Sequence, residues 1–162
     1  MKKRSLTPNF KATSFGIVAL AFMHAPAASA QEAGLQSAVD WYKNIYAVSY
    51  IEGDPNFYDH YMDQTYLGFG ANVGYLGKSD LEAEMTAYVD PWIKAGWEKT
   101  SLQAVDGVEI NPSTVLLTAR WSLKTADGQS VVDCALPGWS YVVIRNAETW
   151  RVLSEFETPC AD

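Results

Sequence analysis

Residues 114–157 read TVLLTARWSLKTADGQSVVDCALPGWSYVVIRNAETWRVLSEFE, and this stretch decides the fold. Apolar side chains recur along it with a period of two, which predicts β-strands rather than helices. Its turn sequences, Ala126-Asp127-Gly128 and Asn146-Ala147-Glu148, are short enough to join antiparallel strands. With one strand upstream, the predicted meander consists of residues 102–110, 114–124, 130–145 and 149–157.

Upstream of this meander the apolar period is helical. Residues 34–52 predict an amphipathic helix that ends at Gly53, a left-handed cap. Asp54-Pro55 begins a short second helix through Tyr61. A third helix is predicted from residue 79 to about residue 89, and Asp90-Pro91 is expected to end or kink it. Residues 65–69 are a further candidate strand.

The order of these elements predicts an α+β fold. Pro137-Gly138 lies inside a predicted strand, where proline cannot donate to the ladder, so we expect a bulge or bend there. The expected architecture is a cone-shaped domain of three N-terminal helices packed on a curved, mainly antiparallel sheet. Such a cone encloses space for a small, mostly apolar ligand.

The first thirty residues have the order of a secretory signal peptide. A basic start at residues 2–4 precedes an uncharged apolar run at 15–23, and alanines occupy positions 28 and 30. The apolar run is too short to span a bilayer. We therefore expect cleavage before Gln31, a single domain over residues 31–162, and a periplasmic or secreted location.

The charge balance disfavours two classes of partner. The whole chain has a net charge of −7, and residues 1–30 contain four basic residues and no acid, so the expected mature protein carries −11. Phosphate binding requires clustered lysine and arginine, so we expect no nucleic-acid partner. An acidic surface also disfavours anionic membranes, and no second apolar stretch is long enough to span one.

Over roughly residues 34–158 the chain resembles the nuclear transport factor 2-like superfamily, in the branch of ketosteroid isomerase and the SnoaL-like cyclases. The segments that carry the resemblance are Tyr50-Ile51-Glu52-Gly53-Asp54, Phe57-Tyr58, Tyr61, Gly77, Asp127-Gly128, Arg145 and Trp150-Arg151-Val152. The resemblance implies the cone-shaped fold and a possible homodimer. It does not imply one activity, because this fold hosts enzymes and binding modules alike.

The residues that ketosteroid isomerases use are only partly present. Tyr46 lies where the isomerases carry the tyrosine that donates to an oxyanion. The family's base belongs on the first strand, where residues 66–70 contain no acid, and its second acid belongs where residues 140–144 contain none. The resemblance therefore does not extend to ketosteroid isomerase activity.

His60 and Asp133 are the candidates for moving a proton, with Tyr46 as oxyanion donor. His60 is the one histidine after residue 30, and its ordinary pKa suits neutral pH, although we favour a structural or surface role for it. A hairpin turning at residues 126–128 places Asp133 opposite Arg120, as a structural ion pair or as a polar pair in the cone. Asp40 and Glu155 are the other acids that could face inward.

All six tryptophans and all nine tyrosines lie after residue 30. They are core residues or the lining of a ligand pocket. The pocket residues that we expect, besides Arg120, are Tyr46, Tyr50, Trp92, Trp121 and Tyr141. The sequence offers no metal-ligand spacing and no phosphate-binding loop, so we expect no metal and no cofactor.

Cys134 and Cys160 are expected to form a disulfide. The register of the last predicted hairpin brings them near each other, and an exported protein meets oxidising conditions.

These observations predict an exported domain that binds a small hydrophobic or aromatic molecule. Two alternatives stay open. One is a cofactor-free SnoaL-like enzyme, an isomerase, cyclase or dehydratase that uses acid–base chemistry. The other is a dimeric interaction module whose cone is filled.

Overall fold

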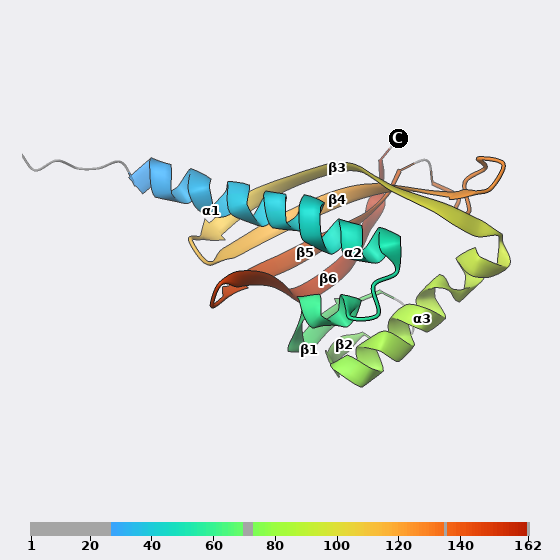
Figure 1. Ribbon diagram of the computed structural model, residues 1–162, viewed down its shortest axis with the longest axis horizontal. Coiled ribbons are helices and arrows are strands. Elements are labelled where there is room, and N and C mark those ends of the chain that lie inside the picture. Colours follow the sequence, from blue (N-terminus) through green and yellow to red (C-terminus); the bar gives the residue numbers. More distant parts are fainter. Residues whose placement is uncertain (1–26, 70–72, 135, 162) are drawn as a thin grey trace, which may run out of the picture.

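A computed structural model describes residues 27–69, 73–134 and 136–161. Its sheet has six strands in the order β2-β1-β6-β5-β4-β3 (Figure 1). β1 runs parallel to β6 and the other neighbours are antiparallel, as predicted for a mainly antiparallel sheet. The strands are β1 (Tyr61–Gly68), β2 (Gly74–Gly77), β3 (Trp97–Asn111), β4 (Thr114–Thr125), β5 (Leu136–Asn146) and β6 (Thr149–Ala161).

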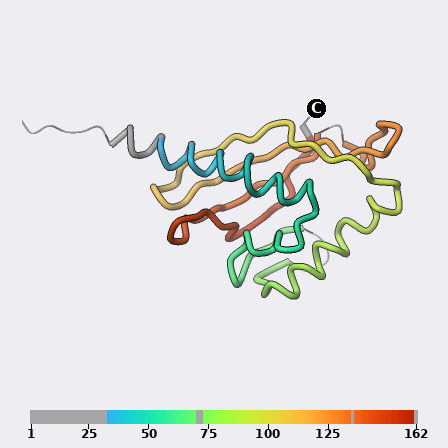
Figure 2. The backbone as a smooth tube through the Cα atoms, in the orientation of Figure 1, coloured from blue at the N-terminus to red at the C-terminus, as the bar shows by residue number. Residues whose placement is uncertain are grey.

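Two long helical segments cover one face of this sheet. The first is continuous through α1 (Ala27–Trp41), a π-helical turn η1 (Tyr42–Tyr46) and α2 (Ala47–Glu52), and it contacts β3 and β4. The second is α3 (Lys78–Lys94), which contacts β1, β2 and β3. Figure 2 follows the backbone along both segments. The expected α+β cone is confirmed.

The second of the three predicted helices is wrong in extent. It is a single 3-10 turn, η2 (Phe57–His60), because residues 54–56 form a turn and β1 already begins at Tyr61. Asp54 stabilises that turn by accepting a hydrogen bond from the backbone N–H of Asn56, at 2.8 Å. Too few residues then separate the turn from β1 for a longer helix.

The third helix was predicted to end near residue 89, and this end is wrong because α3 runs past Pro91. It continues to Lys94, because the carbonyls of Pro91 and Ile93 accept hydrogen bonds from the backbone N–H groups of Ala95 and Gly96, each at 3.0 Å, and these bonds hold the turn that follows the proline. Lys94 pairs with Asp90 one turn earlier, and Gly96 terminates the segment at φ +86°. The extra turn carries Trp92, which therefore stays on the helix.

The predicted pairing of Arg120 with Asp133 is wrong. In the β4–β5 ladder Arg120 lies opposite Gly138, and Asp133 is exposed. Close to the turn the expected register does occur, as an isolated bridge between Lys124 and Ser130. The chain then leaves the ladder until β5 begins at Leu136, and these extra residues shift the register.

The predicted disulfide between Cys134 and Cys160 is confirmed, with a Cα–Cα distance of 5.9 Å. The predicted irregularity at Pro137-Gly138 is confirmed as well, as a register shift between Leu136 and Gly138 in the β5–β6 ladder. Together they hold the C-terminal end of β6 against the start of β5.

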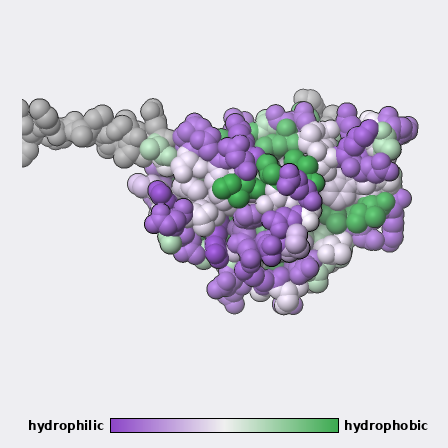
Figure 3. All heavy atoms as spheres, in the orientation of Figure 1, coloured by the Kyte–Doolittle hydropathy of each residue, from purple (hydrophilic) through white to green (hydrophobic). Residues whose placement is uncertain are grey.

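The core lies between the helices and the inner face of the sheet. Along β4 the inward side chains alternate with outward ones, and the inward ones are Val115, Leu117, Ala119, Trp121 and Leu123. The face shown in Figure 3 is mostly polar, with a hydrophobic area over the first helical segment, where Ile45, Val48 and Ile51 are exposed.

The predicted signal peptide falls mostly outside the described residues, since α1 begins at Ala27. None of the helices in the described part of the chain combines the length and hydropathy of a membrane-spanning segment.

Candidate functional site

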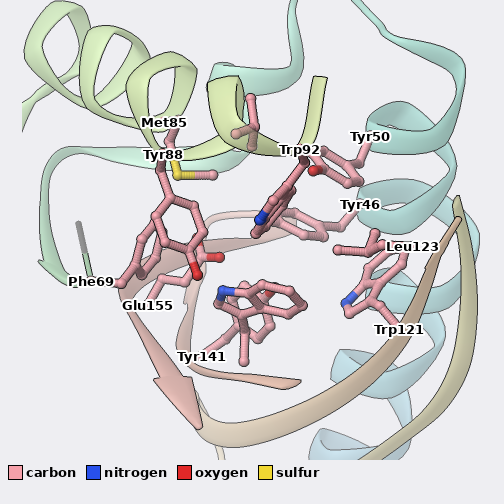
Figure 4. A pocket seen from close by; sticks show the side chains of 12 residues that line it. Tyr46, Tyr50, Phe69, Met85, Tyr88, Trp92, Trp121, Leu123, Tyr141 and Glu155 are labelled. Atoms are coloured by element: carbon pink, nitrogen blue, oxygen red, sulfur yellow. The ribbon is translucent and has the colours of Figure 1, made fainter. Parts of the chain in front are cut away.

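An aromatic pocket lies between α2, α3 and the inner face of β4, β5 and β6 (Figure 4). Glu155 is the charged residue in its lining. The full lining is Tyr46, Tyr50, Phe69, Met85, Tyr88, Val89, Trp92, Trp121, Leu123, Trp139, Tyr141 and Glu155. The free volume is about 30 Å³, room for about two water molecules, because the aromatic rings fill most of the space.

The two-residue period of the strands turns Trp121, Trp139 and Tyr141 inward. Tyr141 lies directly opposite Glu155 in the β5–β6 ladder, so both side chains reach the same end of the pocket. Trp139 lies opposite Glu157 in the same way, two pairs further along the ladder. The pocket wall is therefore continuous across these strands.

The π-helical turn accounts for the tyrosines on the first helical segment. In a regular α-helix, residues four apart drift by about 40° around the axis. The wider turn at Tyr42–Tyr46 absorbs part of this drift, so Tyr42, Tyr46 and Tyr50 all face the sheet. The Tyr42 ring stacks on the Tyr46 ring, with 4.9 Å between the ring centroids. Tyr46 and Tyr50 line the pocket, and Tyr42 lies behind Tyr46.

α3 supplies Met85, Tyr88 and Trp92, at helical spacings of three and four. Tyr88 and Trp92 pack edge to face at 5.0 Å, and both are half-buried. Trp92 reaches the pocket because α3 continues past Pro91.

A chain of hydroxyls leads to Glu155. Tyr61 Oη donates to Glu155 Oε2 at 2.6 Å, and Tyr46 Oη lies 2.5 Å from Tyr61 Oη. Since Tyr61 has a single hydroxyl proton and gives it to Glu155, Tyr46 is the donor of the second bond. Both tyrosines and Glu155 are buried.

Burial governs the protonation of these groups. Loss of solvent raises the pKa of Glu155 from 4.5 to about 7, and the hydrogen bonds from Tyr61 and Tyr141 oppose part of that rise. Burial also raises the pKa of Tyr46, Tyr61 and Tyr141 well above 10.0. At neutral pH the site thus combines neutral hydroxyl donors with a carboxyl group that is close to half-protonated.

A second hollow adjoins the pocket. It is a groove of about 950 Å³ between α3, the segment that precedes β5 and the C-terminal end of β6, where Cys134 and Cys160 form the disulfide. Tyr88, Trp92 and Trp139 line both hollows, so these three side chains form the partition between them. A ligand that moved this partition would pass from the groove to Glu155.

The structure brings together five of the predicted pocket residues: Tyr46, Tyr50, Trp92, Trp121 and Tyr141. The other three predicted site residues lie elsewhere. Arg120 alternates with the inward Ala119 and Trp121, and it donates to the carbonyl of Pro159 at 2.7 Å. Asp133 lines the outer groove.

His60 lies beside Tyr46 but does not belong to the pocket lining. Its Nε2 is 3.0 Å from Ser49 Oγ, and its ring lies 6.0 Å from that of Tyr46. Partial burial lowers the pKa of His60, which favours the neutral imidazole. These contacts indicate a structural histidine that supports the first helical segment.

From the sequence, Glu155 is one of two further acids that could face inward, and Tyr61 is not among the predicted site residues. The reason is a bulge in β6. Val142 pairs with Ser154 but Val143 pairs with Val152, so Leu153 is an extra residue. Regular alternation from Val152 would turn Glu155 outward, and the extra residue turns it in.

Among the described residues, no group of three or more histidine, cysteine, aspartate or glutamate side chains is arranged to hold a metal ion. The polar groups that the pocket offers are hydroxyls, indole N–H groups and the Glu155 carboxyl. They suit hydrogen bonding and proton transfer.

Several solved structures share this fold. Aln2 from a Streptomyces species superposes with a TM-score of 0.58 at 16% identity, covering 76% of this chain and 89% of that one. A protein from Catenulispora acidiphila, in complex with S-DNPA, gives 0.56 at 14% identity, over 77% and 92%. A protein from Novosphingobium aromaticivorans, proposed to be a scytalone dehydratase, gives 0.55 at 10% identity, over 83% and 91%.

No protein-family model and no curated protein sequence matches the chain. The structural likeness therefore concerns the fold, which is the nuclear transport factor 2-like cone.

Proposed function

We propose that this domain binds a small hydrophobic or aromatic molecule in the aromatic pocket. The observation that carries the proposal is the pocket itself, in which tyrosines and tryptophans from both helical segments and the sheet converge on one buried carboxyl group. A core needs no such group, because burying a carboxyl has a desolvation cost. A binding site gains an orienting contact from it.

The bound molecule would enter from the groove. The free volume of about 30 Å³ is too small for a ring-containing ligand, so the partition must move. Tyr88 and Trp92 are half-buried on the groove side, and rotation of their side chains joins the pocket to the space of about 950 Å³ outside. The Catenulispora acidiphila protein with the same fold was solved with a small molecule bound, which supports a ligand role.

Tryptophan fluorescence and thermal unfolding test this proposal. Flat aromatic probes added to residues 31–162 should quench tryptophan emission and raise the melting temperature as the probe concentration rises. Trp92→Ala should weaken binding at least tenfold, whereas Ile93→Ala, an exposed neighbour on α3, should leave it unchanged. If both variants bind the probes equally well, the aromatic pocket is not the binding site.

A second candidate, a cofactor-free acid–base enzyme, is favoured by the pKa of about 7 at Glu155. A group with that pKa can take or give a proton at neutral pH. Once Glu155 has taken the substrate's proton, it can donate to Tyr61, and Tyr61 can donate to Tyr46. The hydroxyl proton of Tyr46, which lines the pocket, is then free to stabilise an oxyanion, as in isomerisation, cyclisation or dehydration. Because His60 and Asp133 lie outside the pocket, Glu155 takes the role that the sequence offered to them.

Substitutions separate the enzyme from the binding domain. For any substrate found, Glu155→Gln should abolish turnover and retain binding, and Tyr46→Phe should lower kcat. Turnover that survives both substitutions would exclude this mechanism. His60→Gln serves as the control, because we expect it to change stability without changing turnover.

We also propose that the protein is exported, with residues 1–30 removed before Gln31 and a single domain over residues 31–162. The disulfide supports an oxidising location such as the periplasm or the exterior. Mass spectrometry of the protein from the producing cell would test the cleavage point. A mature N-terminus upstream of Gln31 would contradict it.

A homodimer is proposed on a separate observation. Val108, Ile110 and Leu116 are exposed side chains on the β3–β4 hairpin, and they lie on the outer face of the sheet. Such an apolar area suits contact with a second copy. Light scattering should give twice the monomer mass, and Val108→Lys should reduce it to the monomer value. The alternative of an interaction module with a filled cone predicts the dimer without ligand binding.

A further inference from the structure

The charged side chains that line the pocket and the groove all carry the same sign. Glu155 lies in the pocket, while Glu84, Asp133 and Glu157 line the groove. Within the described part of the chain, neither lining includes a lysine, an arginine or a histidine. An anionic ligand would therefore meet acidic side chains and no basic one in either lining, so the two hollows disfavour it.

The walls around Glu155 are ring systems that attract positive charge. Trp92 packs edge to face against Trp139 at 5.9 Å and against Trp97 at 5.7 Å. The face of an indole ring has negative electrostatic character, and it binds ammonium groups most strongly where water is excluded. The partition between groove and pocket is therefore a surface that favours a cation on both sides.

We propose that the ligand is an organic cation, a quaternary or protonated amine on a compact apolar or aromatic body. Its nitrogen would lie between the Glu155 carboxylate and the faces of the pocket tryptophans. This inference rests on the proposed binding function and adds the charge of the ligand to it.

Glu155 is the anchor for that charge. It is 3% exposed, and the groups that hydrogen-bond to it are neutral tyrosine hydroxyls, so its ionised form is held by neutral donors. A buried carboxylate without a positive partner is unstable, and a cationic ligand supplies the missing charge. The groups around it point to an organic cation instead of a metal ion, because aromatic rings are poor metal ligands and no cluster of metal-binding side chains occurs among the described residues.

The same anchor makes binding depend on pH. The titratable groups that interact with Glu155 are all tyrosines: Tyr61 from β1, Tyr141 from β5, Tyr42, Tyr46 and Tyr50 from the first helical segment, Tyr58 from η2 and Tyr88 from α3. The pKa of each of these tyrosines is raised, mainly by burial, so they stay neutral through pH 8. Glu155 then ionises near pH 7, and cation binding should strengthen as it does.

A pair of probes with the same shape tests the proposal on the unaltered protein. Phenyltrimethylammonium carries a permanent positive charge, and tert-butylbenzene is its neutral counterpart. Titrations at pH 8, followed by tryptophan fluorescence, should give at least tenfold tighter binding of the cation. The affinity for the cation should fall about tenfold between pH 8 and pH 5.5, and that for tert-butylbenzene should not change.

Variants assign the effect to the pocket. Glu155→Gln should remove both the preference for the cation and its pH dependence, whereas Glu157→Gln in the groove should weaken cation binding only two- to threefold. Equal or tighter binding of tert-butylbenzene overturns the cation proposal and leaves the binding function in place. If neither probe binds, both the cation proposal and the proposed binding function are wrong.

Discussion

The β5–β6 hairpin contains two regions that differ in what they bury. Near its turn, Val143 and Val152 face each other, and both apolar side chains are fully buried. Beyond Leu153, Tyr141 faces Glu155, and the buried pair is polar. The two regions share the same strands and the same side of the sheet, so the difference arises from a single extra residue in β6.

This comparison shows what a carboxyl group needs in order to be buried. At Glu155 a tyrosine hydroxyl donates to the carboxyl group at 2.6 Å, and the raised pKa lets the group take a proton. Val152 lies opposite Val143 in β5 and opposite Tyr61 in β1, whose hydroxyl already donates to Glu155. The pocket is therefore a position inside an aromatic core where hydroxyl donors allow a carboxyl group to be buried. The region near the turn buries only the apolar pair Val143 and Val152.

The largest expected effect comes from moving a carboxyl group into the turn region. Val152→Asp should lower the free energy of unfolding by about 3–5 kcal/mol at pH 8, because the position is fully buried and the hydroxyl of the neighbouring Tyr61 is already used by Glu155. Urea unfolding measures it. Val152→Ala, which removes volume without adding charge, should cost about 2 kcal/mol. A similar loss from both variants would contradict the contrast between the two regions.

The second-largest expected effect comes from removing the disulfide beside the pocket region. Replacing Cys134 and Cys160 by serine should lower the free energy of unfolding by about 3.5 kcal/mol, since the bridge closes a loop of 26 residues. The control is the unaltered protein with reductant, which should show the same loss. If ligand binding also weakens, the disulfide positions the groove as well as stabilising the fold.

A smaller effect is the pH dependence of stability that Glu155 contributes. Its pKa in the folded protein, about 7, is above the 4.5 expected when unfolded, so between these values the folded state binds the extra proton. Glu155 therefore adds its full contribution to the free energy of unfolding below pH 4.5. As the pH rises through 7 that contribution is lost, and the total loss is roughly 3 kcal/mol. Denaturation of Glu155→Gln from pH 4.5 to 8 should lack this decline. An identical decline in both proteins would show that Glu155 does not titrate in this range.

The smallest effect concerns the hydroxyl that supports Glu155. Tyr61→Phe should lower the free energy of unfolding by about 1–3 kcal/mol, and by more at pH 8 than at pH 5, because the ionised carboxylate loses a donor. Tyr75→Phe, at an exposed tyrosine, is the matched control and should be neutral. A Tyr61→Phe loss that does not change with pH would indicate packing alone.

Much of the fold could be predicted from local patterns. The helical period of residues 34–52, the two-residue period of the strands and the short turns all specify nearby geometry, and the structure has those elements. The cysteine pairing followed from the hairpin register, because that register is set by a turn only a few residues long. Five pocket residues followed as well, since large aromatic side chains on inward positions converge in any cone.

What failed depended on contacts across the chain. Arg120 lost its predicted partner because the residues before Leu136 leave the β4 ladder, a choice that the turn sequence does not encode. The predicted end of the third helix near residue 89 also failed, since α3 continues through Pro91 to Lys94. Neither result can be read from period or composition.

The sequence by itself determined the order of helices and strands, the aromatic content of the core, the acidic charge and the disulfide. The tertiary structure alone decided which acid became the functional candidate. Alternation along β6 depends on hydrogen bonds to β5, and the bulge at Leu153 changes that pairing, so the direction of Glu155 is a property of two strands together. The tyrosines that make its burial tolerable come from β1 and β5, and only folding brings them to it.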